Sequence, residues 1–279
     1  MADYIEGRRA TEEALRAGVP IRCAYVQAAS ASAAPSKKGR KAGEKPPRSK
    51  GGTGSDAGGD QNLECLVDKL RDAGVRVETV DREFLDRVSA EGRSHGAHQG
   101  IVCEVPPYRY ADIDDIARAG AAKDSSLVLV LDHITDEGNL GAVIRTAEVV
   151  GADGVVIASK RAAQVTVGVY KTSAGAAFHV PVARVPNLVS ALDALKRVGF
   201  WVAGASEHAR EDIWHAPLDG RVALVCGNEG AGISRLVQES CDFLVALPQR
   251  GQVGSLNVAQ ATTAICYEWL RRLYAAQEA

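Results

Sequence analysis

The sequence lacks the features that mark a membrane protein or a secreted protein. No apolar run approaches the roughly 20 residues that a helix needs to cross a bilayer. No signal peptide precedes the first candidate helix, and the six cysteines are scattered without any Cys-x-x-Cys pair. Scattered cysteines of this kind are typical of reduced thiols rather than of a disulfide framework. We therefore expect a cytoplasmic protein with no contact to a membrane.

A strong charge of one sign and a pattern of metal ligands are missing as well. The formal net charge is -2, so bulk electrostatics gives no argument for nucleic acid, and any RNA contact must come from local basic patches. The six histidines are dispersed, and the one close pair, His95 and His98, has no third ligand nearby. We expect no metal site and interpret these histidines as loop or RNA contacts.

The chain is nevertheless long and apolar enough for a large core. Its 279 residues, 46% of them hydrophobic, suffice for one large domain or two ordinary ones. Residues 29–60 are different, because alanine is their only apolar side chain apart from proline, and such a segment cannot bury enough surface to offset its ordering entropy. We expect a disordered insertion there, whose basic core 37–50 either contacts RNA phosphates or is a solvated spacer.

Around the insertion, the pattern predicts a small three-layer α/β domain over residues 1–105, closed by Pro106 and Pro107. A linker with a short helix at 112–122 follows over 106–124. The elements expected in the first domain are helices over 6–17, 63–73 and 81–90, and strands over 21–28, 75–80 and 101–105.

The second domain, residues 125–279, alternates strands and helices. Its strands are rich in Val, Leu and Ile without alternation, which favours a parallel sheet covered on both faces. We expect Asn139, Asn187 and Asn257 to cap helices, and Arg271 and Arg272 to suit the negative end of the last helix. The strands are expected over 127–131, 154–158, 179–185, 200–205, 222–226 and 243–247, and the helices over 139–150, 164–176, 188–198 and 258–273.

Three segments within this pattern combine glycines with polar residues: NLGAVIRTAEVVG over 139–151, VCGNEGAGIS over 225–234, and the glycine-punctuated loop of 247–257. Turns at the ends of parallel strands offer backbone donors and acceptors to a ligand, and glycines let the backbone approach it closely. Each segment alone is weak support for a site. Gly230 and Gly232 are explained equally well by a tight turn, and their order, G-x-x-G-x-G, is not that of a dinucleotide fingerprint.

Together and in this order, the segments resemble the signature motifs of the SpoU (TrmH-like) branch of the SPOUT RNA methyltransferases. One departure is Gln249, where the family usually has Met. The matches are Asn139, Gly141, Arg145, Thr146 and Ala147 in the first motif, Gly227, Asn228, Glu229, Gly230 and Gly232 in the second, and Pro248, Gly251, Ser255, Leu256 and Asn257 in the third.

The resemblance implies an α/β fold with a deep trefoil knot in the C-terminal parallel sheet. His98-Gln99-Gly100 before a strand resembles the end of the family's N-terminal RNA-binding domain, which has the fold of ribosomal protein L30e. The chain is most similar to the bacterial group that methylates a guanosine of 23S ribosomal RNA. A structured RNA, ribosomal RNA in particular, and a second copy of the chain in a homodimer are the implied partners.

The same resemblance implies S-adenosyl-L-methionine as cofactor, and its sulfonium is already activated, so the reaction needs no metal. The residues implied to line the adenosine pocket are Gly227, Leu247 and Leu256, with Ala205, Gly251 and Ser255 beside them. The residues implied for catalysis are Arg145, with Asn139, Glu229, Ser255 and Asn257 positioning it and the ribose.

Arg145 stands among apolar residues in the sequence, and a buried guanidinium requires a partner. Glu229 is the structural candidate for that partner, and substrate phosphate is the functional one. The family's arginine is proposed to accept the proton of the 2′-hydroxyl. A guanidinium with a pKa above about 12 is almost never deprotonated in proteins, so stabilising the developing alkoxide is the other role open to it.

Other functions remain open at this stage. Transfer RNA, or a ribosomal nucleotide whose methylation gives antibiotic resistance, would be alternative substrates. A non-catalytic RNA-binding factor of ribosome assembly would keep the fold. The presence of all four polar motif residues argues against it, because an inactive protein would be expected to have lost one of Arg145, Glu229, Ser255 and Asn257. A Rossmann-type dehydrogenase is disfavoured, because residues 131–139 lack the glycine fingerprint.

Overall fold

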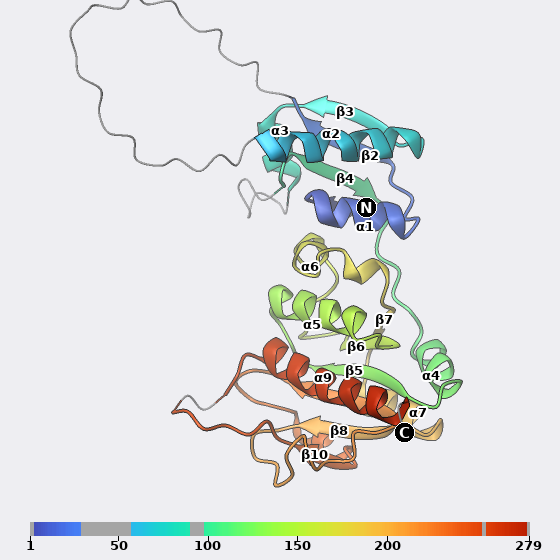
Figure 1. Ribbon diagram of the computed structural model, residues 1–279, viewed down its shortest axis with the longest axis vertical. Coiled ribbons are helices and arrows are strands. Elements are labelled where there is room, and N and C mark those ends of the chain that lie inside the picture. Colours follow the sequence, from blue (N-terminus) through green and yellow to red (C-terminus); the bar gives the residue numbers. More distant parts are fainter. Residues whose placement is uncertain (1–2, 29–56, 90–97, 253–254, 278–279) are drawn as a thin grey trace, which may run out of the picture.

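The computed structural model describes residues 3–28, 57–89, 98–252 and 255–277, although side chains only from residue 62 onward in the second range. Two α/β units lie one beyond the other along the long axis (Figure 1). The N-terminal unit has a four-stranded mixed sheet in the order β1-β4-β2-β3. Its elements are β1 Asp3–Glu6, α1 Arg8–Arg16, β2 Cys23–Gln27, α2 Ala57–Asp72, β3 Arg76–Val80, α3 Arg82–Val88 and β4 Ile101–Val105.

Helices cover both faces of this first sheet, in agreement with the expected three layers. Ala24 of β2 belongs to the apolar cluster that contains Leu66 and Leu70 of α2, whereas the next residue, Tyr25, contacts Phe84 of α3. Successive strand residues point to opposite faces, so α2 and α3 lie on opposite sides. The sequence missed β1, a four-residue strand that pairs antiparallel with β4.

The expected insertion, 29–60, lies outside the described residues except for 57–60. Those four residues form the first turn of α2, so the prediction was wrong at that end. Once a helix is nucleated, each further residue adds a backbone hydrogen bond, and the helix extends beyond its apolar stripe.

The C-terminal unit has a six-stranded sheet, entirely parallel, in the order β10-β8-β9-β5-β6-β7. This confirms the expected parallel α/β fold, whereas the knot stays a prediction. The elements are α4 Ile113–Ala121, β5 Ser126–Asp132, α5 Glu137–Val149, β6 Gly154–Ala158, α6 Val167–Thr172, a 3-10 turn at Ala176–Phe178, β7 Val182–Val185, α7 Leu188–Arg197, β8 Trp201–Ala205, β9 Arg221–Gly227, α8 Arg235–Glu239, β10 Phe243–Val245 and α9 Val258–Gln277.

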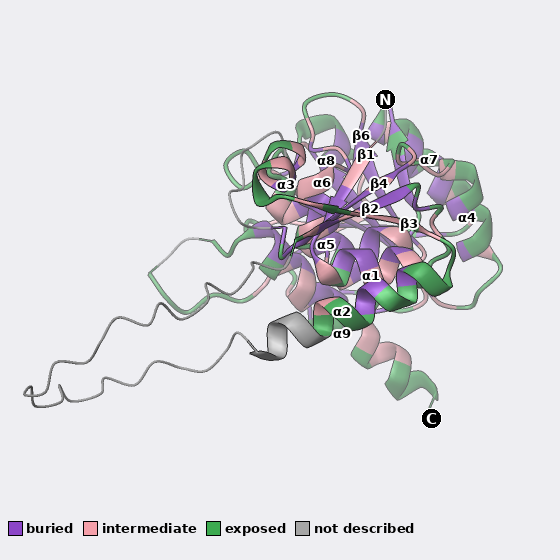
Figure 2. Ribbon diagram, turned by 90° about the horizontal axis from the view of Figure 1, so that it is seen from above, coloured by how far each residue is buried: buried purple, intermediate pink, exposed green. Residues whose placement is uncertain are grey.

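Alternate residues of the central strands enter two separate cores. Leu129 and Leu131 of β5 pack with α5, α6 and α9, whereas Val128 and Val130 pack with α4, α7 and α8. The strands are therefore buried on both faces, as Figure 2 shows. The segment expected to be a linker contributes α4 to this second core, where Ile116 is almost fully buried.

Two helices depart from expectation. The helix predicted for 164–176 is limited to Val167–Thr172, because Thr166 is extended and Ala174 and Gly175 adopt left-handed backbone conformations that end it. The expected strand at 179–185 begins only at Val182, because a 3-10 turn at 176–178 is followed by His179 in a helical backbone conformation and by Pro181, which lacks an N–H. The cap of α5 is Asp136 rather than Asn139, since the Asp136 carboxylate accepts the Asn139 N–H at 2.7 Å.

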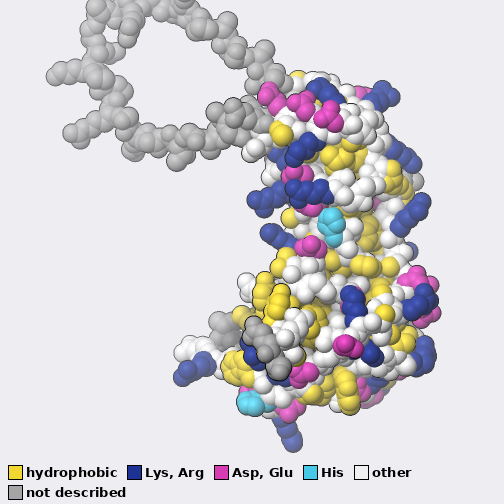
Figure 3. Space-filling view, turned by 45° about the vertical axis from the view of Figure 1, so that its right-hand side comes forward, with side chains coloured by type: hydrophobic (Ala, Val, Ile, Leu, Met, Phe, Trp, Pro, Cys, Tyr) yellow, Lys and Arg dark blue, Asp and Glu magenta, His cyan; other side chains and the backbone are white. Residues whose placement is uncertain are grey.

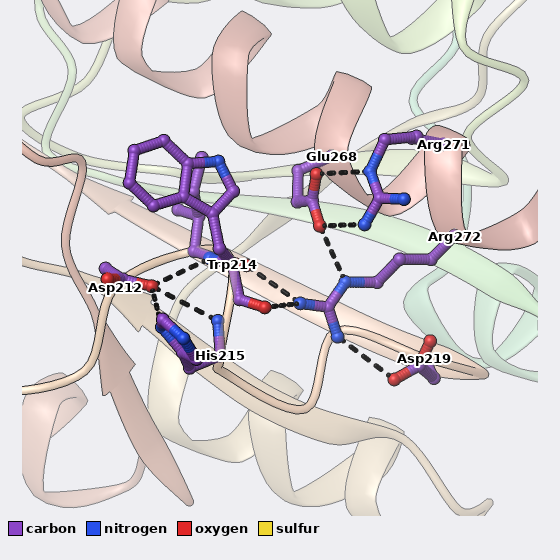
Figure 4. A network of polar contacts seen from close by, with 8 residues as sticks. Asp212, Trp214, His215, Asp219, Glu268, Arg271 and Arg272 are labelled. Carbon is purple, nitrogen blue, oxygen red and sulfur yellow. Dashed lines mark hydrogen bonds and ion pairs between the residues drawn. The ribbon is translucent and has the colours of Figure 1, made fainter.

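The last helix, α9, is anchored by an ion-pair network around the buried Glu268 (Figure 4). The Glu268 carboxylate accepts hydrogen bonds from Arg271 and Arg272, each at 2.8 Å, and Arg272 also binds Asp219 and the carbonyl of Trp214. Hydrogen bonding to Arg271 lowers the pKa of Glu268 to about 2, against its desolvation. The two arginines therefore do not end the helix, which continues to Gln277. Arg272 fixes α9 against the loop before β9.

The two units touch through α1 and the segment around α6. Gly175, with φ of 88°, lies so close to α1 that an added Cβ would be 2.5 Å from the Glu13 Cβ. Lys171 of α6 pairs with the buried Glu6 of β1 at 3.2 Å. The apolar cluster is continuous from one unit to the other, so the N-terminal unit rests directly on the layer that covers α5.

Candidate functional site

A cavity of about 260 Å³ lies where β8, β9 and β10 end and α9 begins. The ends of parallel strands meet at one edge of a sheet, so residues far apart in the sequence meet there. Five of the six residues proposed for cofactor binding line it: Ala205, Gly227, Leu247, Ser255 and Leu256. The sixth, Gly251, is exposed and does not line the cavity; an added Cβ there would meet nothing within 4 Å.

Gly227 forms part of the cavity wall at a position where no larger residue fits. A Cβ at this position would lie 2.2 Å from the carbonyl carbon of Gly232. The turn folds back on itself, since Asn228 and Gly232 exchange both backbone hydrogen bonds, and Gly232 has φ of 66°. The tight turn and the cavity wall, two interpretations that the sequence left open, are therefore both features of the same loop.

Three polar side chains from separate elements meet beside this cavity. Asn139 of α5 donates its Nδ2 to Glu229 Oε1 at 2.8 Å, and Asn257 donates its Nδ2 to the same oxygen at 2.7 Å and to Asn139 Oδ1 at 2.9 Å. We call Asn139, Glu229 and Asn257 the polar triad. Each comes from a different one of the three motifs, so the structure brings the motifs together at one point.

The triad is fixed in orientation but remains accessible. Asn257 Oδ1 accepts the backbone N–H of Ala259 at 2.9 Å, which confirms Asn257 as the cap of α9 and holds its amide toward Glu229. Both Asn257 and Glu229 are exposed. Within the described part of the chain, the second carboxylate oxygen of Glu229 accepts no hydrogen bond, so it is open to a ligand.

Arg145 does not join the triad within one chain. Its side chain is exposed, and it forms no hydrogen bond or ion pair with any described residue. The expected burial was therefore wrong, and so was the pairing with Glu229 of the same chain. Asn139 and Arg145 are six residues apart on α5, which separates them by about 9 Å along the axis and by about 240° around it. The apolar neighbours that suggested burial, such as Ile144 and Ala147, point away from Arg145 around the helix and are buried.

The cavity also contains residues that the sequence did not single out. Cys226 and Thr262 line it, and Thr262 Oγ1 donates to Cys226 Sγ at 3.1 Å. Burial raises the pKa of the Cys226 thiol to about 11, so this sulfur is an unreactive part of the wall. Glu207 and His208, after β8, line the cavity as well. Only their place after a strand end could have indicated them.

Neither a metal cluster nor a membrane helix occurs among the described residues. No group of three or more His, Cys, Asp or Glu is placed to hold an ion there. No helix in the same part of the chain has the length and apolarity to span a bilayer. Lys and Arg side chains on the face in Figure 3 are interspersed with Asp and Glu.

Comparison with known proteins identifies the family. Residues 126–267 match the SpoU rRNA methylase family, and residues 55–111 match a model described as RNA 2′-O ribose methyltransferase substrate binding. YacO of Bacillus subtilis, named for the TrmH family of tRNA/rRNA methyltransferases, is 41% identical over 208 residues, which cover 74% of this chain and 82% of that protein. A Staphylococcus aureus protein named for the same family is 39% identical and covers 76% and 84%.

Solved structures agree on the fold. The SpoU methyltransferase AviRb from Streptomyces viridochromogenes superposes with a TM-score of 0.73 at 24% identity, covering 99% of this chain and 91% of that one. The same protein has been solved in complex with the cofactor AdoMet. An rRNA methyltransferase from Sinorhizobium meliloti gives a TM-score of 0.72 at 22% identity, covering 98% and 88%. From the family models and the relatives in Bacillus subtilis and Staphylococcus aureus, the chain belongs to the SpoU rRNA methylase family and is an RNA methyltransferase with an N-terminal substrate-binding domain.

Proposed function

We propose that the protein transfers a methyl group from S-adenosylmethionine to a ribose 2′-oxygen of structured RNA, with a guanosine of 23S ribosomal RNA as target. The polar triad carries this proposal. A carboxylate and two amides from three separate motifs converge at the rim of a cavity, where they can orient a ribose hydroxyl. The triad is accessible to solvent and therefore to RNA.

The cavity fits a nucleoside cofactor. Its volume of about 260 Å³ is close to the lower end of the range of about 300–1,000 Å³ that is usual for small-molecule sites. Its wall combines apolar side chains, such as Val245, Leu247 and Ile265, with the backbone of the turn at 227–232. S-adenosylmethionine, when bound, supplies a methyl group already activated by the sulfonium. The chain's own task is to exclude water, hold the hydroxyl in line with the methyl group and stabilise the charge on oxygen.

Arg145 supplies that charge stabilisation from a second copy of the chain. It is exposed, has no partner among the described residues and lies on a different face of α5 from Asn139. A homodimer that packs α5 against its counterpart would bring the Arg145 of one subunit toward the triad of the other. A guanidinium stabilises a developing alkoxide without losing its own proton.

The variant Arg145→Ala tests this role. Methyl transfer to RNA, followed with tritiated donor, is expected to disappear, while donor affinity in calorimetry stays nearly unchanged because Arg145 does not line the cavity. Arg118→Ala is the matched control, since Arg118 is an exposed arginine of α4, paired only with Asp115 among described residues. Normal turnover by Arg145→Ala would refute the proposal.

Mixing two inactive variants tests the shared site. At equal mixing, about half of the dimers are hybrids of Arg145→Ala and Glu229→Gln. Each hybrid has one intact site out of two, which gives about one quarter of wild-type activity. A site built within one chain would show no recovery. Mass spectrometric mapping of nucleosides in ribosomal and transfer RNA from cells with and without the gene then identifies the target, and a missing 2′-O-methyl group in transfer RNA alone would exclude the ribosomal one.

A further inference from the structure

The carboxylate of Asp132 is buried at the end of β5, next to the site but outside its motifs. Its side chain is only 1% exposed. One oxygen lies 2.5 Å from His133 Nδ1, and the other accepts the backbone N–H of Ser234 at 2.6 Å. A buried carboxylate is costly unless its oxygens are bonded, so both contacts are needed. The carboxylate thereby joins two segments of the chain that are about a hundred residues apart.

Both segments lead directly to the polar triad. Ser234 closes the turn that starts at Asn228 and contains Glu229. At the start of this turn, Asn228 Nδ2 donates to the backbone carbonyl of His133 at 3.0 Å. The turn is therefore fastened at its two ends to two consecutive residues, Asp132 and His133, at the end of the central strand.

The backbone of His133 shows that these contacts act against strain. Its φ is 57°, in the left-handed region that is unfavourable for a residue with a Cβ. Such a conformation persists only where the surroundings over-determine it. Here the ring is held by Asp132 and the carbonyl by Asn228, so the strained residue faces the turn in one orientation.

We propose that Asp132 is a positioning residue for methyl transfer: by holding Ser234 and His133, it sets the place of Glu229 and of the cavity wall formed by 228–233. The inference rests on the proposed function in one respect, namely that the cavity holds S-adenosylmethionine. The fastening of the turn itself does not depend on any ligand.

The variant Asp132→Ala removes the acceptor of the Ser234 N–H and the partner of the His133 ring. We expect the dissociation constant of S-adenosylmethionine to rise about tenfold and kcat to fall by at least as much. Asp132→Asn is expected to stay within about threefold of wild type, because its amide oxygen can accept the Ser234 N–H while its NH₂ faces a histidine nitrogen that can accept. Calorimetry separates affinity from the folded fraction, since unfolded protein reduces only the stoichiometry. Wild-type affinity with reduced stoichiometry in Asp132→Ala would overturn the proposal, and so would an Asp132→Asn variant as weak as Asp132→Ala.

Asp153→Ala is the matched control: Asp153 directly precedes β6 and lies beside the opposite end of β5 from Asp132. Its carboxylate is 9% exposed and accepts a hydrogen bond from Ser126 Oγ at 2.5 Å, where β5 begins. This variant is expected to melt at a lower temperature while keeping wild-type donor affinity and kcat. Loss of donor affinity in Asp153→Ala as large as that in Asp132→Ala would mean that Asp132 acts only through general stability.

Hydrogen exchange of the peptide spanning 228–234 tests the fastening without a ligand. Exchange is expected to accelerate about tenfold or more in Asp132→Ala and to remain unchanged in Asp153→Ala. Unchanged exchange in Asp132→Ala would overturn the inference. A wild-type protein that binds no S-adenosylmethionine, with exchange still accelerated in Asp132→Ala, would instead refute the proposed function and leave the fastening intact.

Discussion

Gly141, the glycine of the first motif, is expected to be required for packing rather than for binding a ligand. A Cβ at this position would lie 1.9 Å from Thr172 Oγ1, 2.8 Å from Thr172 Cβ and 2.9 Å from the backbone nitrogen of Ser173. Rotating the Thr172 hydroxyl away would relieve only the first contact, and it would break the bond to the Gly168 carbonyl at 2.9 Å. The substitution Gly141→Ala therefore forces α6 away from α5.

The expected magnitude follows from two opposing terms. Overpacking a tight contact costs about 1–3 kcal/mol, and alanine in place of glycine inside a helix returns up to about 1 kcal/mol. We expect Gly141→Ala to destabilise the protein by about 1–2 kcal/mol, which lowers the melting temperature of a unit of this size by about 2–8 °C. Donor affinity should change little, because Gly141 does not line the cavity.

Thermal and urea unfolding of three variants tests this reasoning. Gly138→Ala is the control on the same helix, since its Cβ would meet only the side chain of Asp136, at 3.0 Å, and it should be neutral or slightly stabilising. The double variant Gly141→Ala/Thr172→Ala should recover part of the loss because the shortest contact disappears. If Gly141→Ala melts at or above the wild-type temperature, the packing explanation is wrong.

Three further predictions follow from single contacts. Asn257→Ala removes a helix cap and a site residue, so it should lower the free energy of unfolding by about 1 kcal/mol and also abolish most of kcat. Asn187→Ala removes an equivalent cap from α7 and should lower the free energy of unfolding alone. Equal kcat in the two variants would contradict the role of Asn257 in the site. Because hydrogen bonds to its arginines lower the pKa of Glu268 from 4.5 to about 2, its stabilising effect is fully present above pH 4.5 and is lost as the pH falls toward 2. The free energy of unfolding of Glu268→Gln should be lower than wild type by about 1–2 kcal/mol at neutral pH, and the two should converge in acid, as urea titrations at several pH values would show. Lys171→Met should destabilise the contact between the units by about 1–3 kcal/mol, because it leaves the buried Glu6 without this cation; an unchanged melting profile in calorimetry would count against that contact.

The sequence by itself determined most of the second unit. Uninterrupted Val, Leu and Ile runs indicated a buried parallel sheet, because strands covered on both faces need no polar alternation. Asn187 and Asn257 were correctly identified as caps, since a side-chain oxygen before an apolar helical stripe satisfies the free N–H groups. The family was also readable, because its motifs place specific polar residues and glycines at fixed spacing within short segments.

Only the tertiary structure decided where these residues point. From the sequence, Arg145 was expected among apolar neighbours with Glu229 as its partner. In the structure the Arg145 side chain is exposed, and Glu229 accepts hydrogen bonds from Asn139 and Asn257 instead. Likewise, nothing local marks Asp132, whose importance comes from the backbone N–H of Ser234 reaching it across the fold. Helix capping and strand burial depend on neighbours within a few residues, whereas a site depends on contacts between segments that the chain separates. Those contacts exist only after β5, β9 and α9 have packed together.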